Sequence, residues 1–381
     1  MDLWAFNIRH LASLAATARL GSLSAAAQAI SLSQPALTQG LAKLERQFGA
    51  MLFERRPDGM TATDITQVLA SRIDAAMVHI ASPRVTMAQV RALIAVAEAG
   101  SYAGASATTG LSQPTLHRAI SDLSISLRRD LVERRGKGIA FTDAGRRTVR
   151  AFRLARAELV AGLSELTALR GRETGRITIG AMPLSRARLL PSAVTRFHRN
   201  HPEVEIRIVE GSHAELIEPL RDGEIDLLIG ALRDPSPGDD VVQTPLFDDQ
   251  PIVLGRAKHP LAQQATADAK ILAAYPWTIS APGTPLRLLW ERMFQRAGVS
   301  VPPVPVECGS VITIRQMLLD SDFLTLLSPD QVAVELEAGW LARIGKPSTE
   351  LRRTIGVTTR NGWRPTGMQQ MMLADIRASL S

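Results

Sequence analysis

The chain repeats itself near its N-terminus, and this repeat constrains the fold more than any other feature of the sequence. Residues 6–64 align with residues 85–143 at an offset of 79 without gaps, and 19 of the 59 positions are identical. The best-matched stretch, Leu-Ser-Gln-Pro-x-Leu, stands at residues 32–37 and again at 111–116. Two compact copies are too few to stack into a solenoid. We therefore expect two small tandem domains of one fold.

Within one copy the apolar residues recur at helical spacing. They predict a helix over residues 11–18, which Gly21-Ser22 separates from a short alanine-rich helix near 24–29. Ser33 is a good N-cap for a third helix, which carries a face of leucines. These helices indicate a helix-turn-helix, and two short strands around Asp58-Gly59 indicate a wing.

The polar side of the third helix has the chemistry of a DNA-reading surface. Hydroxyl and amide side chains hydrogen-bond to base edges, a helix N-terminus favours a phosphate, and wing arginines suit the DNA backbone. Helix capping and solvation are the alternative roles for each serine and glutamine. The predicted DNA-binding residues are Ser33, Gln34, Pro35, Thr38, Gln39, Arg55 and Arg56 in the first copy and Ser112, Gln113, Pro114, His117, Arg118, Arg134 and Arg135 in the second.

The positive charge is concentrated in one segment. The chain has 44 Lys+Arg and 37 Asp+Glu, a net charge of +7. Residues 84–174 alone hold 15 basic and 8 acidic residues, whereas residues 1–83 carry a net +1 and residues 175–381 a net −1. A local basic excess is the electrostatic footprint of a polyanion binder, although an arginine-rich solvated helix face would give the same count.

Several other classes of protein are disfavoured. A single cysteine, Cys308, leaves no disulfide framework within the chain and no cysteine-based zinc site, and we expect it in the core. No apolar run of 18 residues and no signal peptide are visible, so we expect a cytoplasmic protein without membrane contact. Phosphate-binding loops, H-E-x-x-H, G-x-S-x-G and metal-spaced clusters are missing, so we expect no enzyme activity, no catalytic residues, no metal and no cofactor.

In their order and spacing, these motifs resemble the head of the LysR-type transcriptional regulators. The first copy has Gly21-Ser22, the alanine-rich helix, Ser33-Gln34-Pro35-Ala36-Leu37-Thr38, Leu44-Glu45 and Leu52-Phe53-Glu54-Arg55. The resemblance covers nearly the whole chain and implies a sequence-specific DNA-binding regulator controlled by a small-molecule effector. It also implies a homodimer or homotetramer on double-stranded DNA, with RNA polymerase as a further candidate partner.

The duplicated head departs from the family pattern, which usually has a single winged helix-turn-helix. The first copy loses the family's T-x-A-G ending and has Thr63-Asp64-Ile65-Thr66 there. The second keeps that ending as Thr142-Asp143-Ala144-Gly145 but has Leu123-Ser124 in place of L-E. Gly40 lies inside the first recognition helix, at a cost of up to about 1 kcal/mol relative to alanine. Our hypothesis is that both copies contact DNA.

A helical stretch follows each copy. Residues 146–170 carry apolar side chains at spacings of three and four, from Val149 to Leu169. In the family the equivalent helix pairs two subunits, so this stripe is consistent with a dimer helix, and packing against its own head is the alternative. Residues 67–80 form a shorter amphipathic piece after the first copy.

The sequence texture changes at Gly175. Strand-like runs alternate with predicted helices, which indicates two successive α/β lobes, the first of them with a parallel sheet. This part resembles the effector-binding domain of the family, which is similar in fold to periplasmic solute-binding proteins. Ligands of open α/β sheets bind at the carboxyl ends of strands, near helix N-termini. The residues expected to contact the effector there are Leu184, Ser185, Ser212, His213, Ala231, Ser280, Gly283, Thr284, Arg287, Ser310 and Thr325, with Arg287 a candidate carboxylate partner.

The expected fold class is therefore multi-domain, α + α/β. A first winged helix-turn-helix at 1–66 is followed by a short helical connector at 67–84, a second winged helix-turn-helix at 85–145, and a linker and dimerisation helix at 146–172. The effector-binding domain at 175–381 has lobe I at 175–250 and 351–381 and lobe II at 251–350.

The effector and the mode of DNA contact stay open. Residues 283–287 and 307–310 resemble the subgroup that regulates sugar-binding-protein genes and aromatic-acid catabolism, so we expect a sugar or an organic or aromatic acid. The alternative function is a cytoplasmic small-molecule-binding protein whose DNA contact is nonspecific. The basic duplicated head disfavours a solute receptor, and a total of only five lysines disfavours an architectural DNA protein.

Overall fold

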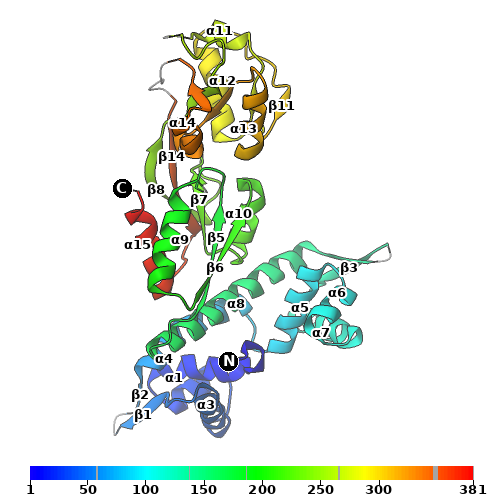
Figure 1. Cartoon of the computed structure of the whole chain (residues 1–381). Coiled ribbons are helices and arrows are strands. Elements are labelled where there is room, and N and C mark those ends of the chain that lie inside the picture. The colour runs from blue at the N-terminus through cyan, green and yellow to red at the C-terminus, as the bar shows by residue number, and fades with distance from the viewer. Residues whose placement is uncertain (57–58, 137, 186, 265–266, 346–350, 381) are drawn as a thin grey trace. The chain divides into compact units, whose positions relative to one another are not determined.

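The computed structural model divides the chain into two compact units (Figure 1). Unit 1 comprises Met1–Gly175 with Asp222–Glu224, and unit 2 comprises Arg176–Arg221 and Ile225–Ser381. The structure describes the chain except for residues 57–58, 137, 186, 265–266, 346–350 and 381. The main boundary between the units falls where the sequence texture changes.

The sequence repeat returns in unit 1 as a repeat of secondary structure. The first copy consists of the 3-10 helix η1 (Leu3–Ala5), α1 (Ile8–Leu20), α2 (Leu23–Ala29), α3 (Gln34–Phe48), β1 (Phe53–Arg56) and β2 (Gly59–Ala62). The second consists of α5 (Met87–Ala99), α6 (Tyr102–Thr109), α7 (Gln113–Leu127), β3 (Val132–Arg135) and β4 (Gly138–Phe141). The bounds of α1, α3, β1 and β2 map onto those of α5, α7, β3 and β4 at the offset of 79. The structure confirms the prediction of two winged helix-turn-helix heads.

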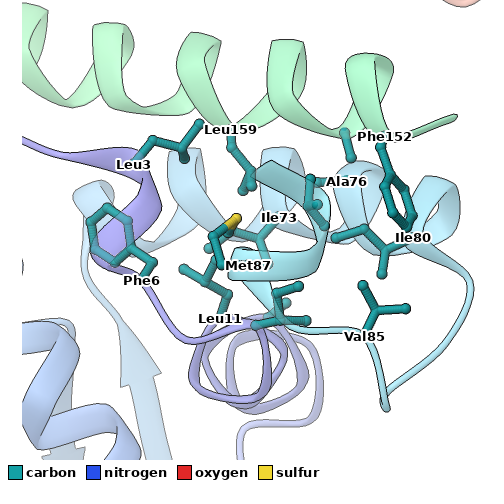
Figure 2. Close-up of a cluster of buried hydrophobic side chains, with 14 of the residues drawn as sticks. Leu3, Phe6, Leu11, Ile73, Ala76, Ile80, Val85, Met87, Phe152 and Leu159 are labelled. Atoms are coloured by element: carbon teal, nitrogen blue, oxygen red, sulfur yellow. The ribbon is translucent and has the colours of Figure 1, made fainter. Parts of the chain in front are cut away.

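A long helix follows each head, and the two long helices pack against each other. They are α4 (Asp64–Ile80) and α8 (Asp143–Leu169). Their apolar faces join both heads in a single hydrophobic cluster, in which Phe152 and Leu159 of α8 are buried (Figure 2). The apolar stripe of residues 146–170 therefore has a packing partner within its own chain.

The two heads have different residues at one closely packed position at the start of the long helix. Gly145 lies in the first turn of α8, and a Cβ there would be 1.9 Å from the carbonyl oxygen of Leu131. The first head has Thr66 at the equivalent position, and its hydroxyl donates a 2.5 Å hydrogen bond to the carbonyl of Leu52. Leu52 and Leu131 are themselves equivalent. The first head has thus exchanged a close backbone approach for a hydrogen bond.

Gly40 has a packing role that offsets its helix-propensity cost. A Cβ at residue 40 would lie 2.9 Å from Cδ2 of His10 on α1. Glycine therefore allows α3 and α1 to approach closely, and any larger residue would displace the imidazole ring.

Lobe I of unit 2 is a five-stranded sheet in the order β6-β5-β7-β14-β8. Its elements are β5 (Gly175–Ala181), α9 (Leu189–Asn200), β6 (Val204–Glu210), α10 (His213–Arg221), β7 (Leu227–Ala231), β8 (Val241–Asp249), β14 (Arg353–Arg360) and α15 (Gly367–Ala378). β5 and β7 pair in parallel, but β14 runs antiparallel to both β7 and β8. The parallel pairing predicted for the first strands of this lobe is confirmed for β5 and β7, and the returning strand β14 makes the sheet mixed.

Lobe II is also mixed. Its elements are β9 (Ile252–Arg256), α11 (Ala269–Ala273), β10 (Thr278–Ile279), α12 (Pro285–Arg296), β11 (Val306–Glu307), α13 (Val311–Asp320), β12 (Thr325–Leu327), the 3-10 helix η2 (Pro329–Val332), α14 (Ala333–Glu337) and β13 (Leu341–Arg343). β10 and β11 pair in parallel, whereas β12 and β13 flank β9 antiparallel to it. The core is centred on Trp277, Trp290 and Phe294, whose rings pack edge-on at 5.2–5.7 Å.

Candidate functional site

The N-terminus of α3 presents polar side chains to solvent. Ser33 caps the helix by accepting a backbone hydrogen bond, and Pro35 stands in the first turn. The leucine face is buried, whereas Gln34, Thr38 and Gln39 are exposed. The Thr38 hydroxyl donates to the carbonyl of Gln34 at 3.0 Å, so it offers only an acceptor to a ligand. This end of α3 thus presents two exposed amides and a hydroxyl acceptor.

The N-terminus of α7 repeats this surface with different chemistry. Ser112 caps the helix, and Pro114 stands in its first turn. Gln113, His117 and Arg118 are exposed. The second head therefore presents an imidazole and a guanidinium where the first presents a hydroxyl and an amide. Heads with different donors are suited to different base pairs.

The wings carry arginine pairs next to their turns. Arg134 and Arg135 of β3 are exposed and pair in register with Ile139 and Gly138 of β4. Consecutive strand residues point to opposite faces, so the two arginines extend to both sides of the wing. Arg55 and Arg56 occupy the equivalent places in β1, but their side chains, like Asp58 of the wing turn, lie outside the described residues.

Replacing Arg134 and Arg135 together by alanine is expected to weaken DNA binding and flatten its salt dependence. Each lost phosphate contact lowers the slope of log Kobs against log[salt] by about 0.9, so the double variant should lose up to about 2 from the slope. Titration of a labelled duplex at several salt concentrations measures it. The exposed pair Arg196 and Arg199 of α9 provides the matched control. An unchanged slope in the β3 variant would contradict phosphate contact by this wing.

In lobe I the structure places the expected effector residues at the ends of neighbouring strands. They are Leu184 and Ser185 after β5, Ser212 and His213 after β6, and Ala231 at the end of β7. The Ser185 hydroxyl is buried and donates to the carbonyl of Met182 at 2.9 Å. Ser212 bonds to Glu215 through both its hydroxyl and its backbone N–H. Both serines therefore have structural roles in their turns.

In lobe II most of the expected residues belong to helix caps. Ser280 and Thr284 hydrogen-bond to each other at 2.8 Å, and Thr284 caps α12 after Gly283, whose φ is +75°. Ser310 caps α13. Thr325 is buried in β12. Thr284 and Ser310 therefore have structural roles at the starts of α12 and α13.

Arg287, the expected carboxylate partner, already has a carboxylate on its own helix. Its Nε lies 2.7 Å from Oε1 of Glu291, and its guanidinium lies 4.7 Å from the ring centroid of Trp290. The side chain is only 12% exposed. A ligand would have to compete with Glu291 or use the buried Nη1, which has no hydrogen-bond partner among the described residues.

Sequence reasoning missed Arg233, which follows the end of β7 by two residues. Burial, and then the positive charge of Arg353, lower its pKa. Burial, Arg233 and Arg221 together lower the pKa of His213 to about 4. We call these four residues, His213, Arg221, Arg233 and Arg353, the His213 cluster. The strand-end rule that selected Ala231 would have found Arg233 if applied two residues further.

The charges of the His213 cluster are not all balanced by the protein. Arg353 pairs with Asp249 at 2.7 Å, and Arg221 pairs with Asp240 at 2.8 Å. Nε of Arg233 and Nε2 of His213, by contrast, are buried without a hydrogen-bond partner among the described residues. Buried polar atoms of this kind are uncommon in folded proteins, and a ligand group is one of the ways in which their bonding can be completed.

Replacing His213 by glutamine is expected to reduce the acid sensitivity of the fold. The pKa of His213 is about 4, below the ordinary value of 6.5, so the unfolded chain binds more protons between these pH values. The stability that His213 contributes above pH 6.5 is therefore lost as the pH falls towards 4. Denaturant unfolding at about pH 7 and about pH 4.5 should show a smaller acid loss in the variant than in wild type. Equal losses of stability in variant and wild type would contradict the lowered pKa of His213. The same substitution at the exposed His198 of α9 is the control.

Family comparison accounts for most of the chain. Residues 170–374 match the LysR substrate binding domain, and residues 8–67 and 87–146 each match the bacterial regulatory helix-turn-helix protein, lysR family. The chain belongs to the LysR family of transcriptional regulators. It is a DNA-binding transcriptional regulator with an effector-binding domain, and not an enzyme. Among the described residues, no helix combines the length and apolar character needed to cross a membrane.

Individual relatives match this LysR-family chain over different shares of its length. It is 31% identical to the HTH-type transcriptional regulator GalR of Pseudomonas putida, over 97% of this chain and 96% of that protein. It is 27% identical to the regulator YdcI of Escherichia coli K12, over 78% of this chain and 97% of that protein. A full-length OxyR variant from Pseudomonas aeruginosa shares the fold with a TM-score of 0.59 and 22% identity, over 77% of this chain and 98% of that chain.

Proposed function

We propose that this LysR-family regulator recognises a specific DNA site with both heads and that a small anionic effector, held between the lobes of unit 2, modulates this recognition. The observation that carries the proposal is the pair of equivalent recognition helices, each with exposed polar side chains at its N-terminus. An α-helix fits the major groove, where each base pair presents a distinct set of donors and acceptors.

The His213 cluster supports an anionic effector. Two of its buried nitrogen atoms have no hydrogen-bond partner among the described residues, and burial and the charge of Arg353 lower the pKa of Arg233. A carboxylate would supply the missing acceptor and the missing negative charge. A sugar acid or an organic or aromatic acid has such a group, whereas a neutral sugar does not.

The effector would act through a difference in affinity between two arrangements of the protein. β8 leads from lobe I to β9 of lobe II, and β14 returns from lobe II beside β8. Arg353 and Asp249 are the paired ends of these two strands. A ligand at the His213 cluster therefore touches the segments about which the lobes would rotate. It can shift the equilibrium by no more than its differential affinity.

Footprinting on the DNA beside its own gene tests the proposed function. At fixed physiological salt, wild-type protein should protect a discrete site that survives competition by unrelated DNA. Aromatic acids and sugar acids are then added singly, with the corresponding neutral amides or sugars as controls. An acid that changes the footprint of wild type but not of Arg233→Gln supports the effector site. Diffuse, salt-sensitive binding alone would favour a small-molecule-binding protein with nonspecific DNA contact.

A further inference from the structure

The packing of α4 against α8 has the pattern of a two-fold interface. In Figure 2, Leu159 of α8 points towards Ile73 of α4, and Phe152 points towards Ile80. At the offset of 79, residue 159 is the equivalent of 80, and residue 152 is the equivalent of 73. In the numbering of the first copy, position 73 of each long helix therefore faces position 80 of the other long helix. Reciprocal contacts of this kind define an isologous interface, which here lies inside one chain.

A buried ion pair selects this pairing over the alternatives. The side chain of Arg72 is 6% exposed, and its Nη2 and Nε bond to the two carboxylate oxygens of Glu165 at 2.5 and 3.0 Å. Its Nη1 lies 3.2 Å from Oε2 of Glu158. Arg72 is thus the cation that two carboxylates of α8 share.

The two copies are not interchangeable at this ion pair. The equivalent of Arg72 in α8 is Ala151, and the equivalent of Glu158 in α4 is His79. Pairing of α8 with the α8 of a second chain in the same register would place Glu158 opposite Ala151, and Glu158 would lose its cation. The ion pair with Arg72 is available only between the unlike helices, so it favours α4 and α8 as partners.

We propose that one chain forms a complete two-headed DNA-binding unit, closed by α4 and α8 of that same chain, and that it binds a two-part site with unlike halves. Among the described residues of α8, the exposed large apolar side chains are Val160 and Leu169, so α8 keeps little apolar surface for a second copy. The heads present different side chains, since Thr38 and Gln39 correspond to His117 and Arg118. Two unlike heads joined by a reciprocal helix contact fit a non-palindromic site.

A disulfide between the two helices tests whether they pair within one chain. A Cβ on Gly162 would lie 3.2 Å from Cβ of Arg72, near the separation of about 3.5–4.5 Å that a disulfide needs. We would combine Arg72→Cys and Gly162→Cys with Glu158→Gln, Glu165→Gln and Cys308→Ser. Equal amounts of ¹⁴N- and ¹⁵N-labelled chains are refolded together and oxidised, and the linked peptides are weighed by mass spectrometry.

The isotope pattern separates the outcomes. We expect linked peptides that are wholly ¹⁴N or wholly ¹⁵N, and none in Gly162→Cys with Cys308→Ser alone. Mixed-isotope peptides, in about half of the linked product, would overturn the proposal, because the helices would then come from different chains. The absence of a linked peptide in protein with wild-type circular dichroism would overturn it too.

The DNA part of the proposal rests on the proposed function and uses unmodified protein. Native mass spectrometry counts the chains bound to the footprinted duplex, and the footprint counts the protected half-sites. We expect two half-sites per chain, and at least a tenfold loss of affinity when one half-site is replaced by a copy of the other. One half-site per chain would overturn this inference alone. Intrachain disulfides with only diffuse DNA binding would overturn the proposed function as well.

Discussion

Replacing Arg72 by methionine is expected to destabilise unit 1 by about 3–5 kcal/mol. The change removes the arginine that pairs with Glu158 and Glu165, whose side chains are only 17% and 23% exposed. Both carboxylates then lie at the α4–α8 contact without this cation. Methionine keeps most of the aliphatic volume, so the loss reports the charge and not a cavity. Equilibrium urea unfolding, followed by circular dichroism, measures the change in the free energy of unfolding.

A second ion pair that involves α4, but is exposed to solvent, provides the matched control. Arg19 of α1 lies 3.1 Å from Asp74, and the two side chains are 57% and 42% exposed. Exposed pairs of this kind contribute about 0–1 kcal/mol, so Arg19→Met should unfold nearly as wild type does. If Arg72→Met lost no more stability than Arg19→Met, the buried ion pair would not hold the two helices together.

Replacing Gln34 or Gln113 by alanine is expected to weaken operator binding by roughly 5- to 150-fold each. Both amides are exposed at the start of a recognition helix, and a bidentate contact with a base contributes about 1–3 kcal/mol. The losses should add in the double variant if the heads read separate half-sites. Quantitative footprinting at constant salt measures the affinities and shows which half of the footprint each change affects.

The expected effect is on recognition and not on folding. Exposed surface substitutions usually change stability by less than about 0.5 kcal/mol, so the unfolding curves of both variants should match wild type. Gln295→Ala, at an exposed glutamine of α12 in unit 2, controls for loss of an amide elsewhere. Unchanged affinity in both recognition-helix variants would remove these glutamines from the set of base-reading residues.

The candidate DNA surface followed from the sequence more completely than the effector site did. The exposed glutamines at the two recognition helices are marked locally, by an N-cap serine and a buried leucine face. The same local rule also assigned Ser33 and Ser112 as DNA contacts, and their side chains cap α3 and α7. Capping and DNA contact require the same residue type at the same place, so the sequence does not separate the two roles.

The effector residues were harder to predict because their partners are distant in sequence. Arg287 was expected to meet a ligand carboxylate, but Glu291, one helical turn away, already pairs with it. Arg233 gains its significance from His213 and Arg353, which belong to other elements of lobe I. Strand-end positions are visible in a sequence, whereas the charges that converge on them are set by how the strands are ordered.

The sequence by itself determined the repeat, its two winged heads and the change to an α/β domain, because each depends on spacing within a short stretch. Tertiary structure decided which helices and strands pack against each other. It packed α8 against α4 of the same chain, turned β14 antiparallel to its neighbours, and brought Arg72 to Glu158 and Glu165. An apolar stripe predicts that one face of a helix is buried. Which element buries it depends on contacts between residues far apart in the chain. Here that partner is the helix of the other repeat.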